Sequence, residues 1–126
     1  MKVKIERIAD LFDDDIVEEM LSIVEELHSC HWNAGMVCHT FKDWDSINYC
    51  EGYLDNNIGH AINIYIDYYG IKHYFDVTQE YNVKNNYQKQ CNGNFDVIKE
   101  YSGDEIIDIF DKDGIAHLIS VENTRF

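Results

Sequence analysis

Three residues of the 126-residue chain, Cys30, His60 and Asp76, are of the types that together carry out nucleophilic catalysis. A cysteine attacks as its thiolate, and a nearby imidazolium or a helix N-terminus lowers its pKa. A histidine can take and return the proton, and a carboxylate can orient that histidine and stabilise its charged form. Taken singly, the three also fit a core thiol, a structural histidine and an aspartate at a strand end. The elements that position them therefore decide between the two interpretations.

Two helices are predicted near the start of the chain, and the second one positions Cys30. Apolar residues at helical spacing predict an amphipathic helix over about 14–28. Ser29 is a typical N-cap residue, and the apolar stripe that follows runs from Cys30 to Phe41. Cys30 would then lie in a first helical turn, with its side chain toward the core. Its backbone N–H, which has no acceptor inside the helix, could stabilise an oxyanion.

The rest of the chain is mainly β-rich, and its order predicts the fold class. Gly103 or the serine before it would open a short helix that extends to Phe110. The polar stretch 79–94 gives no clear prediction. Together these elements predict a single α+β domain over residues 1–126, with N-terminal helices packed on an antiparallel β-sheet. The predicted strands are 48–54, 59–68, 71–78, 95–101 and 115–121.

A hairpin between the second and third of these strands would bring His60 and Asp76 onto one face of the sheet. A three-residue loop at 68–70 places His60 opposite Thr78, with Asp76 diagonal to it. A loop at 67–69 places His60 directly opposite Asp76. In both registers a carboxylate–imidazole hydrogen bond is within reach. A two-residue loop or an uncompensated bulge would separate the two side chains.

The motifs around these residues occur in a recognisable order. They are Cys30, Tyr49-Cys50-Glu51-Gly52-Tyr53, His60-Ala61 and Phe75-Asp76-Val77-Thr78. This order resembles the transglutaminase-like superfamily of papain-type cysteine enzymes. The start Cys30-His31-Trp32-Asn33-Ala34, followed by Tyr-x-Glu-Gly-Tyr, is similar to short phage and bacterial members. The chain departs from many members at Ile62, where they have Trp, and at Val77, where they have Pro.

The resemblance implies a papain-like or transglutaminase-like core and a catalytic triad of Cys30, His60 and Asp76. It implies acyl transfer through a thioester on a protein, peptide or other amide substrate, by hydrolysis, deamidation or crosslinking, and it implies no cofactor. For the second oxyanion donor, His28 and Trp32 are the candidates in the sequence.

A zinc site is the rival chemistry for the same cysteines. The chain contains neither a C-x-x-C nor an H-E-x-x-H spacing. Cys30 and Cys38 would lie two helical turns apart, roughly 12 Å, which is too far for both to bind one ion. We therefore expect no metal site, and no Gly-rich phosphate loop is present.

Charge and hydropathy restrict the partners. The formal net charge of −14 disfavours nucleic acid and anionic membranes. It suits a basic protein surface, or it serves only solubility. A second hypothesis is therefore a non-catalytic acidic interaction or inhibitor protein on a degenerate cysteine-enzyme scaffold. Residues 1–10 lack an apolar signal region and no apolar run is long enough to span a membrane, so we expect a cytoplasmic protein with reduced thiols.

Overall fold

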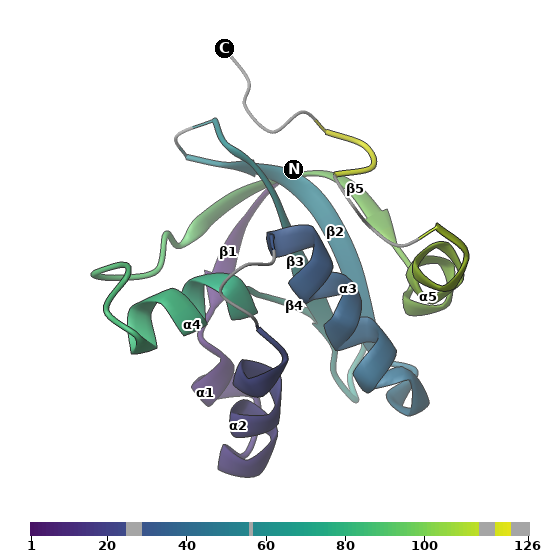
Figure 1. The fold of residues 1–126 in the computed structure, drawn as a ribbon, viewed down its shortest axis with the longest axis horizontal. Coiled ribbons are helices and arrows are strands. Elements are labelled where there is room, and N and C mark those ends of the chain that lie inside the picture. Colours follow the sequence, from purple (N-terminus) through teal and green to yellow (C-terminus); the bar gives the residue numbers. More distant parts are fainter. Residues whose placement is uncertain (25–28, 56, 114–117, 122–126) are drawn as a thin grey trace.

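The computed structural model describes residues 1–24, 29–55, 57–113 and 118–121, and within them the fold is mixed α+β (Figure 1). The strands close into a barrel in the order β1-β4-β3-β2-β5. All neighbouring strands in this barrel are antiparallel except β1 and β4, which run parallel, so the predicted purely antiparallel sheet was wrong for that pair. The strands are β1 (Lys2–Glu6), β2 (Ile47–Leu54), β3 (Gly59–Ile66), β4 (Lys72–Phe75) and β5 (Asn94–Tyr101).

Helices cover one side of this barrel. Figure 1 shows α3 lying across β2 and β3, with α4 and the α1–α2 pair on one flank and α5 on the other. The predicted second helix is confirmed, including its start directly after Ser29. The first predicted helix ends earlier than expected, and residues 25–28 lie outside the described part of the chain. The helices are α1 (Ile8–Leu11), α2 (Asp14–Ile23), α3 (Cys30–Thr40), α4 (Val77–Lys84) and α5 (Gly103–Asp113), with a 3₁₀ turn at Lys42–Trp44.

Two hydrophobic clusters hold these layers together. One lies between the helices and the barrel, and it includes Val37 of α3, Tyr49 of β2 and Ile106 of α5. The other consists of strand residues such as Ile64 and Phe95 and fills the barrel interior. Burial of this apolar surface on both sides fixes β2 and β3, whose buried residues run nearly without interruption. His60 therefore lies on one of the two most deeply buried strands.

The β3–β4 hairpin has the register expected for a three-residue loop at 68–70. Pairs run from Ile66 with Lys72 to Asn63 with Phe75, and the Asp67 N–H donates to the carbonyl of Ile71 at 3.0 Å. The predicted strand 71–78 is too long, because β4 ends at Phe75 and the chain turns there into α4.

Two other segments differ from what the sequence analysis assigned to them. The segment 79–94, left unassigned, contains most of α4, which packs through Glu80: its carboxylate accepts from Arg7 Nε at 2.9 Å and from the Ile8 N–H at 2.7 Å. The predicted last strand at 115–121 is not formed at 118–121, where residues 119–121 are bends, and 114–117 lie outside the described residues. The helix predicted from Gly103 is confirmed as α5. Among the described helices, none has the length and apolar character needed to cross a membrane.

Candidate active site

Cys30 is the first residue of α3, so its thiol lies at a helix N-terminus. As a first-turn residue its N–H has no acceptor inside the helix, and the partial positive charge of that terminus favours a thiolate. The side chains of His60 and His31 both act on the Cys30 thiol, and both lower its pKa. The His31 contact was not expected from the sequence. Because His31 Nε2 also lies 2.7 Å from the Ser29 hydroxyl, this ring is held by a neutral group, whereas His60 is held by a carboxylate.

The pKa of the Cys30 thiol is lowered to about 6. Burial raises this pKa, but the charge of His60 and the hydrogen bonds from His31 and His60 outweigh it. The backbone of Ala61, next to His60 in β3, adds a further hydrogen bond in the same direction. At neutral pH the group is therefore mainly thiolate, the form that attacks carbonyl carbon.

His60 and Asp76 form a buried pair. His60 Nε2 lies 2.6 Å from Asp76 Oδ2, and the Asp76 side chain is only 1% exposed. Burial lowers the pKa of His60, but the charges of Asp76 and Cys30 outweigh it and hold that pKa well above its ordinary value. Because Nε2 is engaged by Asp76, Nδ1 is the ring nitrogen left to serve Cys30. The three predicted triad residues thus lie together, and the imidazole of His60 lies between the thiol of Cys30 and the carboxylate of Asp76.

Asp76 is held in place by the first turn of α4, a helix that the sequence analysis did not predict. It is the N-cap residue, and its Oδ1 accepts from the Gln79 N–H at 3.1 Å. Gln79 Nε2 also donates to Asp76 Oδ2 at 2.8 Å. The spacing Asp76-x-x-Gln79 is that of a capping box, and this signal could have predicted the helix start. It does not predict the role of Gln79, because the Gln79 side chain bonds to the Asp76 carboxylate and not to the Asp76 N–H as in a capping box.

The other thiols are in different environments. All four cysteines lie in the described part of the chain, and only Cys30 has a lowered pKa. Burial raises the pKa of Cys38 to about 12 and, with help from the charge of Glu80, that of Cys91 to about 11. Burial and nearby carboxylates, Glu100 first, raise the pKa of Cys50 well above its ordinary value. These three thiols stay protonated at neutral pH, so they serve as internal controls for the reactivity of Cys30.

Glu51, to which the sequence assigned no role, is a fully buried carboxylate that holds the C-terminal segment against β2. Its Oε2 accepts from Tyr49 Oη at 2.5 Å and from the Ile119 N–H at 2.9 Å. Its Oε1 accepts from the Ser120 N–H at 2.6 Å and from the Ser120 hydroxyl at 2.7 Å. Burial raises the pKa of Tyr49 above its ordinary value, and Glu51 and then the charge of Cys30 raise it further. The Tyr49–Glu51 pair therefore lies within electrostatic range of Cys30.

Replacing Glu51 with glutamine is expected to destabilise the protein by about 2 kcal/mol. Both carboxylate oxygens accept from donors, so either orientation of the amide turns an NH₂ group toward an N–H or O–H. Urea denaturation of the variant measures the loss. The matched control is Glu100→Gln, because Glu100 pairs with the exposed Lys72 and its loss should cost less than about 0.5 kcal/mol. Equal stabilities of the two variants would contradict the role assigned to Glu51.

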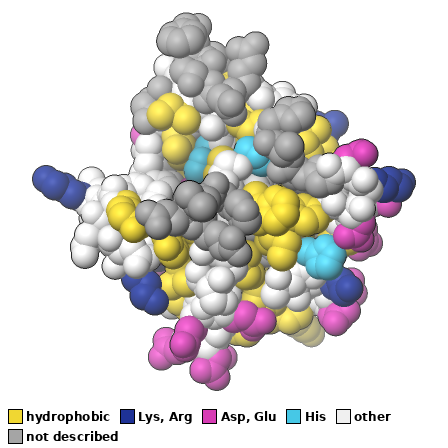
Figure 2. Space-filling model, in the orientation of Figure 1, with side chains coloured by type: hydrophobic (Ala, Val, Ile, Leu, Met, Phe, Trp, Pro, Cys, Tyr) yellow, Lys and Arg dark blue, Asp and Glu magenta, His cyan; other side chains and the backbone are white. Residues whose placement is uncertain are grey.

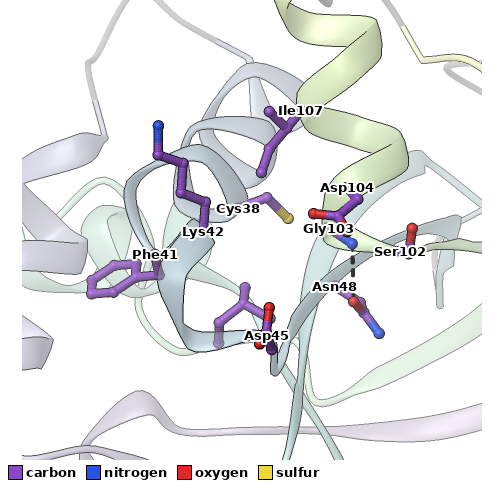
Figure 3. A pocket seen from close by; sticks show the side chains of 10 residues that line it. Cys38, Phe41, Lys42, Asp45, Asn48, Ser102, Gly103, Asp104 and Ile107 are labelled. Carbon is purple, nitrogen blue, oxygen red and sulfur yellow. Dashed lines mark hydrogen bonds between the residues drawn. The ribbon is translucent and has the colours of Figure 1, made fainter.

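A small pocket lies at the opposite end of α3 from Cys30 (Figure 3). It has a volume of about 90 Å³ and is bordered by Cys38, Lys42 and Asp104. The Gly103 N–H donates to Asn48 Oδ1 at 3.0 Å across it, which satisfies a donor at the N-terminus of α5. With a protonated thiol and no histidine among its lining residues, this pocket lacks the groups that the Cys30 site has.

The remaining candidates have other contacts. Asn63 lies on the face of β3 opposite to His60, as predicted, and donates to the carbonyl of Ala34 at 2.9 Å. Trp32 packs against Phe110, with ring centroids 4.7 Å apart, while His28 lies outside the described residues. No group of three or more His, Cys, Asp or Glu side chains in the described ranges is arranged to hold a metal ion.

Figure 2 shows the same face with its side chains. Some histidine side chains lie beside hydrophobic ones near the middle of this face and another lies toward its right edge, where basic and acidic side chains are found; the carboxylates are mostly toward the edges. No known family model matches the chain, and neither curated proteins nor solved structures give a significant match. The case for a site at Cys30 therefore rests on its geometry and on the order of the sequence motifs.

Proposed function

We propose that this protein is a cysteine acyl-transfer enzyme of the papain-like, transglutaminase-like type. The observation that carries the proposal is the buried His60–Asp76 pair, 2.6 Å apart, which acts on the Cys30 thiol at the N-terminus of α3. Cys30 is the nucleophile, His60 the general base and acid, and Asp76 the group that orients His60 and stabilises its charge.

In the first step the Cys30 thiolate attacks the carbonyl carbon of an amide or ester. The Cys30 N–H can donate to the oxyanion that forms. When the C–N or C–O bond breaks, the imidazolium of His60 gives its proton to the leaving group, and a thioester remains on Cys30. His60 then takes a proton from the acyl acceptor, which attacks the thioester and releases the thiolate. Water gives hydrolysis or deamidation, and an amine gives crosslinking; hydrolysis is the default because water is always present.

The proposal is tested with p-nitrophenyl acetate, an activated ester that acylates reactive thiolates. We expect a burst of about one equivalent of p-nitrophenolate per chain and an acetyl group on Cys30 that hydroxylamine removes, as expected for a thioester. Cys30→Ala should show neither, and Cys91→Ser should behave like the wild type. Acetylation of Cys91 or of lysines, with Cys30 unmodified, would contradict the proposal.

The net charge of −14 favours a second candidate, an acidic protein that binds a basic protein surface without catalysis. The two candidates give opposite results with the same variant. Binding to a basic partner would survive Cys30→Ala and weaken with added salt, whereas acyl transfer would be lost in Cys30→Ala and would change little with salt.

A further inference from the structure

Among the described residues, Gln79 alone supplies the hydrogen bonds of the Asp76 carboxylate other than the one to His60. Gln79 donates to it twice, from its backbone N–H to Oδ1 and from its side-chain Nε2 to Oδ2. The second of these bonds ends on the oxygen that faces His60 Nε2. The side chain of Gln79 is therefore one of two donors that fix the orientation of this oxygen.

Gln79 is itself held by the segment that joins α4 to β5. Its Oε1 accepts from the Asn92 N–H at 2.6 Å, and its Nε2 donates to the Asn92 carbonyl at 3.1 Å. Gln88 Nε2 adds a donor to Oε1 at 2.8 Å. Because the backbone N–H and C=O of Asn92 supply a donor and an acceptor that match the two ends of the amide, only one orientation of Gln79 fits. Gln79 is 3% exposed, so water does not readily replace these contacts.

This arrangement has a chemical consequence for the pair beside it. Burial raises the pKa of Asp76, but the charge of His60 outweighs it, and the hydrogen bonds from His60 and Gln79 act in the same direction. A donor to a buried carboxylate stabilises its charged form, and the charged form in turn stabilises the imidazolium next to it. A neutral or rotated Asp76 would leave His60 without that support, and Cys30 would lose its nearest positive charge.

We propose that Gln79 is a positioning residue for the Cys30–His60–Asp76 site, and that through it the backbone of Asn92 sets the reactivity of Cys30. The inference rests on the proposed function, since it names the residue that holds the orienting carboxylate of that site. It also gives the polar segment 85–94 a role: the segment forms the outer support of the site.

The test measures the rate at which iodoacetamide alkylates Cys30 as a function of pH, with the modified residue identified by peptide mass spectrometry. Gln79→Met keeps the size of the side chain and removes its hydrogen bonds. We expect the midpoint of the profile to rise by about one pH unit in this variant. Gln90→Ala, a change in the same segment that leaves Gln79 untouched, should leave the midpoint where the wild type has it. His31, His60 and Tyr49, the titratable groups that face Cys30, are unchanged in both variants.

The outcomes separate this inference from the proposed function. A wild-type midpoint near that of an ordinary thiol would overturn both. A wild-type midpoint near 6 that Gln79→Met does not move would overturn the role of Gln79 alone, even where its melting temperature falls, because a purely structural role lowers stability without changing the midpoint. If Gln79→Met fails to fold by circular dichroism, Gln79→Asn decides. It keeps a buried amide and the backbone N–H bond to Oδ1 but shortens the side chain by one methylene, which withdraws the donor from Asp76 Oδ2. An unmoved midpoint in that variant overturns the inference.

Discussion

Replacing His60 with glutamine is expected to slow the alkylation of Cys30 at pH 6 by about twenty-fold. Without the imidazolium, the thiol pKa moves from about 6 back to its ordinary value of about 9, because burial raises this pKa and the charge that outweighed burial is gone. The thiolate fraction at pH 6 falls from about one-half to about one-thousandth. A more basic thiolate is intrinsically more reactive, which recovers about twenty-fold of that loss.

The sign of the pH dependence follows from the same pair. In the wild type the rate of alkylation falls as the pH drops below about 6, where Cys30 takes up its proton. In His60→Gln the rate should still rise steeply between pH 7 and 9. The matched control is His39→Gln. His39 lies on α3, the helix that carries Cys30, and it pairs with the exposed Asp111 away from the thiol. A His60→Gln profile identical to that of the control would mean that His60 does not activate the thiol.

Replacing Gly52 with alanine is expected to destabilise the protein by about 3 kcal/mol. Gly52 pairs with His60 across β2 and β3, and at this point the β2–β5 register shifts. A Cβ on Gly52 would lie 2.0 Å from the carbonyl oxygen of Asp96 in β5. This oxygen belongs to the backbone of β5 and cannot rotate away as a side chain could. β2 and β5 must therefore move apart next to the position where β2 pairs with His60.

Gly93→Ala is the matched control for this variant. A Cβ on Gly93 would meet nothing within 4 Å, so the substitution should change stability by less than about 0.5 kcal/mol. Thermal melts of the two variants compare them directly. Similar melting temperatures would show that β2 and β5 do not need the close approach at Gly52.

The sequence was most informative where periodicity and capping agree with burial. Ser29 and the apolar stripe after it predicted the start of α3, and with it the position of Cys30 at a helix N-terminus. The alternation in β3 and a three-residue loop predicted the shared face of His60 and Asp76. These are local patterns, and each follows from the chemistry of neighbouring residues.

The parts that the sequence did not predict depend on contacts far apart in the chain. The strand β1 is short and rich in charged residues, so its sequence alone does not predict a strand. It is a strand because it pairs with β4 on one side and β5 on the other and so completes the barrel. The helix α4 lacks an apolar stripe, so periodicity could not find it; Asp76 caps it and Glu80 ties it to Arg7. Glu51 is anchored to Ser120, 69 residues later, by bonds that no local pattern encodes.

The most direct test of the account is the pH profile of Cys30 alkylation in the wild-type protein, followed residue by residue against Cys38 and Cys91. We predict a midpoint at about pH 6 for Cys30, and no comparable reaction of Cys38 or Cys91 below pH 8, since their pKa values are raised to about 12 and about 11. A Cys30 midpoint near 9, or alkylation of Cys30 no faster than that of Cys91 at pH 6, would contradict the account.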